Sequence, residues 1–293
     1  MSAPGARAAR EAAPAVTPAP ALAPGTRPVP GYEILGHLTR TRWLDVHDAW
    51  SEERDCRCVI KVLRPDRRGE AGLGERLLRE GRWLREFSHP HLVRGYETFE
   101  SPEPLVVLET LTGETLSHLV RRLRHRASAA DVALLGVQLC SAVHYLHRRG
   151  LLHLDLKPSN VVVDRGYAKV LDLSVARPPG PAPAGVGTLR YLAPEQARGG
   201  PLTTAADVWG IGVTLFEVAC GEPPFGRDDG TGAPDGRCCP QLERTAPPVA
   251  SRRRLPPALA AAVDACLRPG PPARPALTDL SAALGSARPG ARG

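Results

Sequence analysis

The sequence has few of the features that mark membrane, disulfide-bonded or zinc proteins. Its longest apolar run, residues 211–220, is too short to span a bilayer, which needs about 20 residues. The seven cysteines are odd in number and include no CxxC pair. This pattern argues against a disulfide framework or a zinc site and favours reduced thiols. We therefore expect a cytoplasmic protein without a membrane span.

Glycine is absent between Gly36 and Gly69, a stretch that includes GHLTRTRWLDVHDAW at residues 36–50. A glycine-rich loop cradles phosphate because glycine reaches positive φ and has no Cβ to block the approach of the backbone. The stretch lies shortly before CVIKVL, residues 58–63, where such a loop would be sought. The absence leaves three interpretations open: an intact nucleotide site, a damaged one, or something else.

The overall composition is that of a folded protein of 293 residues, with 42% hydrophobic and 24% charged residues. This length suits one large domain or two lobes. The high content of Ala, Gly, Pro and Arg suggests a bacterial genome rich in GC. Basic runs at residues 121–126 and 251–254 lack interleaved aromatics, so we interpret them as solvated faces and expect no nucleic-acid partner.

Composition and periodicity divide the chain. Residues 1–30, rich in Ala and Pro, are predicted to form a disordered tail, and residues 286–293 a flexible C-terminus. Short alternating runs at 32–38, 43–50 and 57–63 predict an antiparallel meander, and 92–100 and 104–111 predict two more strands. The segment 72–87 has helical spacing, and Glu80 shares the face of Leu77 and Leu84. A charge on that apolar face calls for a buried partner.

Beyond Gly113 the pattern is mainly helical, with strong helix candidates at residues 130–150 and 204–221 and weaker ones at 256–270 and 271–284. The helix at 204–221 is apolar nearly all round and should be buried. The sequence therefore predicts an α+β, bilobal fold with a small β-rich lobe and a larger helical lobe, and a ligand cleft between them.

Polar residues that suit phosphate chemistry gather between the two strong helices. Asp155, Lys157, Asn160 and Asp172 lie in HLDLKPSNVVVDRGYAKVLDLSVAR, residues 153–177. Carboxylate and amide oxygens suit Mg²⁺, a carboxylate can accept a hydroxyl proton, and an ammonium can hold phosphate.

At this point the sequence resembles the protein kinases, specifically the eukaryotic-type (Hanks-type) serine/threonine kinases of bacteria. The resemblance covers about residues 32–285, and its motifs occur in the family's order. It implies a bilobal kinase domain at 31–285, with an N-lobe at about 31–110 and a C-lobe at about 113–285. HLDLKPSN resembles the catalytic loop, DLS stands where the family has DFG, and GTLRYLAPEQ resembles GTxxYxAPE.

The resemblance implies a role for each matching residue. Asp155 would accept the substrate proton, Lys157 would steady the γ-phosphate, and Thr188 would bridge the two. Asn160 and Asp172 would bind the metal, Mg²⁺ or Mn²⁺. The resemblance places ATP against the following residues: Lys61 and its partner Glu80, then Leu38, Val46, Val59, Leu108, Glu109, Leu111 and Val162. Two further expectations are structural: Glu195 should pair with Arg274, and Asp207 should brace the catalytic loop.

The sequence departs from the family's glycine-loop motif. Thr39, Thr41 and Leu44 occupy the three glycine positions, so we expect a hairpin that covers ATP but grips its phosphates less closely, because a left-handed residue with a Cβ is strained. Arg40 or Arg42 could contact phosphate, although solvent exposure of both is the favoured interpretation. Restoring glycine at the three positions should lower the Michaelis constant for ATP.

A second departure concerns the activation loop. Leu154 replaces the arginine of the HRD motif, and residues 175–187 contain no Ser or Thr. Both halves of the usual phosphate switch are missing, so activity should not depend on phosphorylation of this loop. Leu173 and Ser174 replace the Phe and Gly of DFG without removing a metal ligand.

The sequence thus predicts a serine/threonine protein kinase that uses Mg·ATP and protein substrates with Ser or Thr acceptors. The main alternative is a pseudokinase scaffold with weak or no nucleotide turnover. A small-molecule phosphotransferase fits less well, since the APE segment builds a protein-substrate platform. We expect any regulatory signal to come from a cytoplasmic partner.

Overall fold

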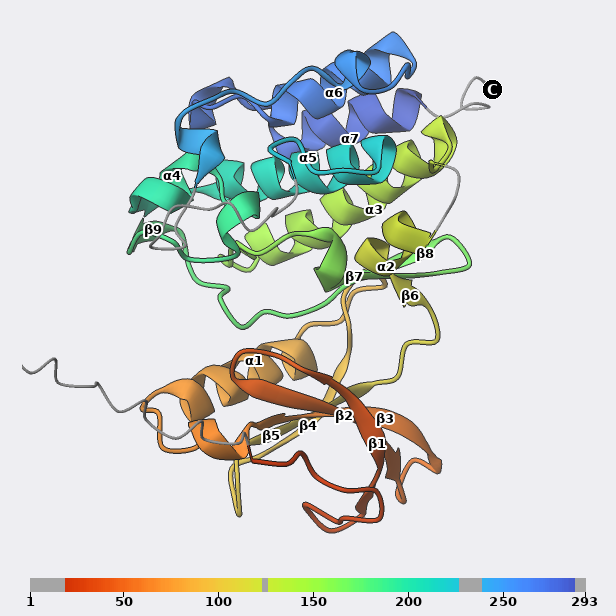
Figure 1. Ribbon diagram of the computed structural model, residues 1–293, viewed down its shortest axis with the longest axis vertical. Helices are drawn as coiled ribbons and strands as arrows, with labels where there is room; N and C mark the ends of the chain where they lie inside the picture. The colour runs from red at the N-terminus through yellow and green to blue at the C-terminus, as the bar shows by residue number, and fades with distance from the viewer. Residues whose placement is uncertain (1–18, 123–125, 227–238, 288–293) are drawn as a thin grey trace, which may run out of the picture.

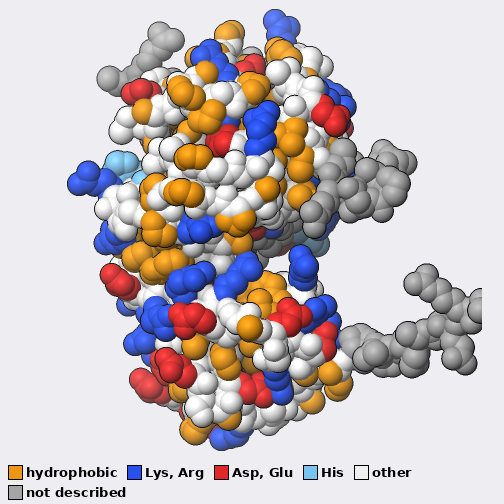
Figure 2. Space-filling view, turned by 90° about the vertical axis from the view of Figure 1, so that its left-hand side faces the viewer, with side chains coloured by type: hydrophobic (Ala, Val, Ile, Leu, Met, Phe, Trp, Pro, Cys, Tyr) orange, Lys and Arg blue, Asp and Glu red, His pale blue; other side chains and the backbone are white. Residues whose placement is uncertain are grey.

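The computed structural model describes residues 19–122, 126–226 and 239–287. The chain folds into two lobes, a sheet with one long helix and a larger body of helices (Figure 1). The α+β bilobal prediction is confirmed. The surface is hollowed between the lobes, and Lys and Arg side chains gather on the smaller lobe where it faces the larger one (Figure 2).

The N-lobe sheet is antiparallel, with strand order β1-β2-β3-β5-β4. Its strands are β1 (Tyr32–Arg40), β2 (Leu44–Ser51), β3 (Cys56–Leu63), β4 (Gly95–Phe99) and β5 (Leu105–Glu109). Alternating burial along β1 and β3 reflects the side-chain period of a strand. All five strands occur where the sequence pattern predicted them.

Helix α1 (Leu73–Glu86) packs on one face of this sheet. Leu77 and Leu84 are buried beneath it, and Glu80 is fully buried on the same face. The helix can come close to the sheet because it has a glycine, Gly81, at the point of contact. A Cβ at this position would lie 2.4 Å from a methyl of Thr98. The helix is therefore held against the sheet, with Glu80 directed inward as its spacing predicted.

The predicted disordered tail, residues 1–30, extends too far. Residues 1–18 lie outside the described residues, but the chain from Leu22 to Val29 packs against the apolar cluster under β1. Gly25 N donates to Ile34 O at 2.8 Å, and Ile34 N donates to Thr26 O at 2.9 Å. The burial of Val29 and these bonds to β1 order a segment whose Ala and Pro content had suggested a disordered tail.

The C-lobe is built around two buried helices. Its helices are α2 (Leu116–Arg122), α3 (Ala129–His147), α4 (Pro194–Arg198), α5 (Thr204–Cys220), α6 (Pro257–Cys266) and α7 (Leu277–Ser286). Every residue of α5 from Ala206 onward is buried, as its all-round apolar pattern predicted. Helix α3 starts at a capping box of Ser128 and Asp131 and packs against α5 and α7. The predicted flexible C-terminus begins at the last residue of α7, and residues 288–293 are outside the described part.

Short strands and turns carry the functional segments between α3 and α5. Strands β6 (Glu114–Thr115), β7 (Val161–Asp164) and β8 (Tyr167–Val170) form one small sheet, and β9 (Gly180–Ala182) pairs with β10 (Gly200–Leu202). Short 3-10 turns in the described residues lie at Pro65–Arg67, Pro158–Asn160, Leu189–Tyr191, Pro240–Leu242, Val249–Ser251 and Pro271–Ala273.

One described helix, α3, is long and apolar enough to cross a membrane by length and composition alone. In its most apolar window 56% of the residues are buried inside the protein. Because core helices of this kind pass the same test, α3 is weak evidence for a membrane span.

Candidate active site

The segment from His153 to Asn160 brings the first group of predicted residues together. Thr188 Oγ1 donates to Asp155 Oδ1 at 2.7 Å, and Lys157 Nζ lies 2.7 Å from Asp155 Oδ2. Lys157 Nζ also donates to Thr188 Oγ1, which closes a triangle. Asn160 Nδ2 donates to the carbonyl and the carboxylate of Asp155 at 2.9 and 3.0 Å. The predicted bridge by Thr188 is present.

Asp207 on α5 holds the start of this segment. Its carboxylate accepts from the backbone N–H groups of His153 at 2.9 Å and Leu154 at 2.7 Å, as expected of a brace. It also lies 2.8 Å from His147 Nε2 on α3, a contact that the sequence did not indicate. Leu154 has φ of 64°, a costly conformation for leucine. The buried carboxylate therefore stabilises a strained turn that carries Asp155.

The His153 side chain is fully buried, and both of its ring nitrogens contact backbone groups. Its Nδ1 accepts from Asp155 N at 3.2 Å, and its Nε2 lies 3.1 Å from Leu171 O. These contacts give His153 a structural role in the turn that carries Asp155.

The second group is an ion pair facing a buried carboxylate. Lys61 Nζ on β3 donates to Glu80 Oε1 on α1 at 2.7 Å, and the Glu80 side chain is fully buried. Burial alone would lower the pKa of Lys61, but the carboxylates of Glu80 and Asp172 outweigh it and raise the pKa. Burial likewise acts to raise the pKa of Asp172, yet Lys61 and the bonds from Ser174 lower it to about 2. Lys61 is therefore held as a cation and Asp172 as an anion.

Two oxygen donors are available for a divalent cation. The amide nitrogen of Asn160 is used by Asp155, which leaves the amide oxygen for a ligand, and Asp172 Oδ1 accepts from Ser174 N at 2.9 Å. Among the described residues, no group of three or more His, Cys, Asp or Glu side chains is placed to hold a metal. One carboxylate and one amide oxygen fit Mg²⁺, which binds through few protein ligands together with substrate phosphates.

Residues expected against the adenine lie on the strands beside Lys61. Val46 pairs with Lys61 across β2 and β3, and Val59 pairs with Leu108 across β3 and β5, so the four side chains share one face. The remaining predicted residues are Val162, buried on β7; Leu38, 55% exposed on β1; and Glu109 and Leu111, partly buried where β5 leaves the sheet. No ligand tests these roles, which stay predictions.

The hairpin at the glycine-loop position avoids the predicted strain. None of residues 39–44 has positive φ. The strands stay paired as far as Arg40 and Asp45, and Thr41 closes the turn, since Leu44 N donates to its Oγ1 at 3.0 Å. The premise of a forced left-handed residue is therefore wrong, because this chain replaces the loop with a paired hairpin whose register shifts between His37 and Thr39 without positive φ.

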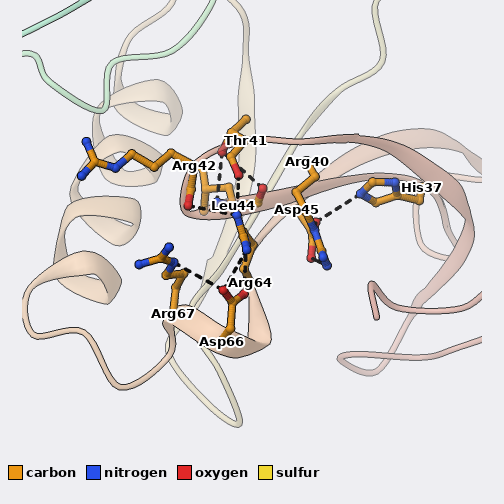
Figure 3. Close-up of polar contacts among 9 residues, drawn as sticks. All are labelled: His37, Arg40, Thr41, Arg42, Leu44, Asp45, Arg64, Asp66 and Arg67. Atoms are coloured by element: carbon orange, nitrogen blue, oxygen red, sulfur yellow. Dashed lines mark hydrogen bonds and ion pairs between the residues drawn. The ribbon is translucent and has the colours of Figure 1, made fainter. Parts of the chain in front are cut away.

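The arginines of the hairpin also differ from expectation. Arg40 donates from Nε and Nη2 to the buried Asp45 carboxylate at 2.7 and 2.8 Å (Figure 3). It thus neither faces solvent freely nor is available for phosphate. The Arg42 side chain is exposed and extends away from that pair (Figure 3). Both side chains were expected in solvent, and only Arg42 is.

The segment after Asp172 is held by contacts that do not involve phosphate. Leu173 is 1% exposed and joins the main core, as expected for a replacement of phenylalanine. Further along, β9 pairs with β10, and Gln196 Nε2 donates to Val186 O and Leu154 O, both at 2.9 Å. Leu154 itself is buried, at the position where the family has an arginine.

The platform beyond Thr188 is anchored by a buried ion pair. Arg274 donates from Nη1 and Nη2 to Glu195 at 2.6 and 2.9 Å, so the predicted pair forms, in a bidentate arrangement. Sequence reasoning missed three residues that secure the site: Arg76, Gln196 and His147. Arg76 could have been found, since it lies one turn before Glu80 on the same helix face. The other two contacts depend on tertiary packing alone.

A family profile described as protein kinase domain matches residues 39–283. The serine/threonine-protein kinase PknB of Mycolicibacterium smegmatis is 33% identical over 180 residues, which cover 57% of this chain and 29% of PknB. PknB of Mycobacterium tuberculosis is 33% identical over 183 residues, covering 58% of this chain and 29% of that protein. The chain thus spans less than a third of the length of these curated relatives.

The crystal structure of the Mycobacterium tuberculosis PknI kinase domain superimposes with a TM-score of 0.71 at 21% identity, covering 91% of this chain and 100% of that one. This likeness shows the fold. Because the family profile covers well over half of the chain, from within β1 to α7, the chain belongs to the protein kinase domain family.

Proposed function

We propose that this chain is a serine/threonine protein kinase that transfers the γ-phosphate of ATP to hydroxyls of protein substrates. One observation carries the proposal: the Lys61–Glu80 ion pair and the Asp155, Lys157 and Thr188 triangle are assembled in the same structure. Phosphoryl transfer relies on positioning and charge stabilisation, so an assembled site has most of what the reaction needs.

The residues of the site have distinct tasks in this reaction. The substrate oxygen bonds to the γ-phosphorus as the bond to the bridging oxygen of ADP breaks, and Asp155 accepts the hydroxyl proton. Lys157, beside Asp155, would steady the transferred phosphate, and Lys61 would hold the inner phosphates while Glu80 fixes its position. A bound Mg²⁺ or Mn²⁺, held by Asp172 and Asn160, would neutralise phosphate charge.

The direct test is transfer of labelled phosphate from ATP to a generic protein acceptor. Asp155→Asn and Lys61→Met should each abolish transfer by the purified chain. Asp279→Asn is the matched control, because Asp279 is exposed on α7, away from the site, and should retain activity. Transfer that persists in Asp155→Asn would contradict the assignment of the base.

The alternative is a pseudokinase scaffold, which the threonines and leucine at the glycine positions favour. The intact ion pair and triangle argue against it. An ATP-dependent rise in melting temperature without transfer would support a nucleotide-binding scaffold, and the absence of both would support a scaffold that does not bind nucleotide.

We further propose that activity does not require phosphorylation of residues 175–187. This segment has no Ser or Thr, its middle is paired with β10, and the carbonyl of the buried Leu154 is bonded to Gln196. Phosphatase-treated protein should keep its activity. Mass spectrometry that finds phosphate on Ser174 or Thr188, the residues that bound the segment, together with loss of activity on its removal, would refute this.

We also propose a cytoplasmic location and protein substrates, with no nucleic-acid partner. Cys58, Cys140 and Cys266 are buried and carry no disulfide, as suits a reducing compartment. Part of the basic runs is engaged by neighbouring groups at the protein surface: Arg126 donates to Arg252 O at 2.9 Å, and Arg122 pairs with Glu114 at 2.8 Å. Filter binding to DNA or RNA should be weak and lost at moderate salt.

A further inference from the structure

We propose that Arg76 is a positioning residue that joins the hairpin, helix α1 and the segment of Asp172 into one unit, in place of a phosphate-dependent latch. Arg76 lies in the first turns of α1. It contacts Trp43 at the hairpin tip and Ser174 two residues after Asp172. This inference rests on the proposed kinase function, because it concerns how that site is kept assembled.

Two hydrogen bonds connect Arg76 to the segment of Asp172. Its Nε donates to Ser174 O at 2.8 Å, and its Nη2 donates to Ser174 Oγ at 3.2 Å. Ser174 N in turn donates to Asp172 Oδ1 at 2.9 Å. The hydroxyl exists because serine stands where the family has glycine. The substitution therefore adds a hydrogen-bond acceptor for Arg76 beside the predicted metal ligand.

A third contact connects Arg76 to the hairpin. The guanidinium carbon lies 4.8 Å from the centre of the Trp43 ring, within the range of a cation–π interaction. Burial lowers the pKa of Arg76 below its usual value, and the nearby carboxylates of Asp172 and Glu80 offset only part of this lowering.

The tip that carries Trp43 is itself fixed. Arg64 donates from Nη1 to Thr41 O at 3.3 Å and to Arg42 O at 3.2 Å, and Asp66 holds its other nitrogens at 2.9 and 2.7 Å (Figure 3). Arg64 N also donates to Trp43 O at 3.0 Å. The hairpin therefore offers Trp43 as a rigid surface for the guanidinium of Arg76.

The contacts of Arg76 help to set the position of α1. A kinase is competent only when its helix glutamate reaches the strand lysine and its metal-binding aspartate is in place. Arg76 and Glu80 lie one turn apart on α1, so one helix face holds both Ser174 and Lys61. Fixing Arg76 at both of its partners thus favours the arrangement in which the Lys61–Glu80 pair forms.

Hydrogen exchange tests the proposal without relying on activity. In Arg76→Ala, amides in peptides covering residues 172–188 and 38–46 should exchange about fivefold or more faster than in the wild type, because the contacts that join them are lost. Arg79→Ala is the matched control, since Arg79 is exposed on the same helix. Equal exchange in Arg76→Ala and the wild type would overturn the proposal.

Kinetics distinguish positioning from general stability. Arg76→Ala should lower kcat about tenfold, equivalent to about 1.4 kcal/mol, and raise the Mg²⁺ concentration for half-maximal rate, because Asp172 is less well placed. Arg76→Lys should restore part of the rate, and Ser174→Gly, which keeps only the bond to the carbonyl, should lie between wild type and Arg76→Ala. A variant that merely unfolds would lose active protein without changing its Mg²⁺ requirement, and that result would refute a positioning role.

The two proposals can fail separately. A wild-type chain without transfer would contradict the kinase function, whereas the exchange comparison would still decide whether Arg76 joins the three elements. A wild type that transfers phosphate and an Arg76→Ala variant with unchanged Mg²⁺ dependence would contradict only the role of Arg76.

Discussion

Replacing Leu44 with glycine should destabilise the N-lobe strongly, although the family motif has glycine at that position. Leu44 begins β2, is 3% exposed and belongs to the main apolar core. In a glycine-rich loop, glycine at this position would serve to give the backbone conformational freedom. Here the residue fills space, so triple glycine restoration at positions 39, 41 and 44 cannot test phosphate binding cleanly.

The magnitude follows from two terms. Truncating a buried leucine to alanine costs about 2–5 kcal/mol, and glycine in a strand adds about 0.5–1 kcal/mol. The sum, roughly 3–6 kcal/mol, is a large part of the 5–15 kcal/mol that typically stabilises a domain. For a chain of this size each kcal/mol shifts the melting temperature by about 2–4 °C. We expect Leu44→Gly to melt at least about 6 °C below the wild type.

Thermal unfolding followed by circular dichroism measures this shift. Leu35→Gly is the matched control, because Leu35 lies on the neighbouring strand β1 but is 41% exposed. It should lower the melting temperature by only a few degrees, about 1 kcal/mol or less in free energy. Equal shifts for the two variants would refute the view that Leu44 serves the core rather than a flexible loop.

Three further predictions concern the hairpin and the brace. Asp45→Asn removes the charged partner of Arg40 and should lower the free energy of unfolding in urea by about 1–3 kcal/mol. Thr39→Gly alone should lower the Michaelis constant for ATP, since it removes an exposed Cβ at a glycine position; an unchanged constant would mean that the hairpin holds ATP in another way. Burial acts to raise the pKa of Asp207, but its bonds, first that from His147, lower it below the usual value. Its stabilisation is therefore present above about pH 4 and lost on acidification, and urea titrations from about pH 5 to pH 3 should show a smaller fall in Asp207→Asn than in the wild type.

The first group of candidate site residues could be predicted because its members are close in sequence. Asp155, Lys157 and Asn160 lie within one short, turn-rich segment, so the chain itself brings them near one another. Glu80 was found from helical periodicity, since an acidic residue on an apolar helix face requires a buried cation. Lys61 then followed as its partner from the resemblance.

The hairpin and the tail could not be predicted in the same way. An absent glycine motif does not say whether a strained loop or an unstrained hairpin replaces it. The Arg40–Asp45 ion pair shows that it is a hairpin, because these two side chains meet only when β1 and β2 pair in the register that places Arg40 opposite Asp45. The packing of Val29 under β1 likewise depends on a neighbouring surface that composition does not describe.

The sequence by itself determined the two-lobe architecture, the family and which residues to look for in the candidate site, because periodicity and short motifs are local properties of a chain. Only the tertiary structure decided how the site is held in place. Arg76 and Ser174 are 98 positions apart, and the carboxylate of Asp207 reaches the backbone of Leu154 across 53. Such contacts depend on where side chains point after the lobes have packed, and no local pattern encodes that direction.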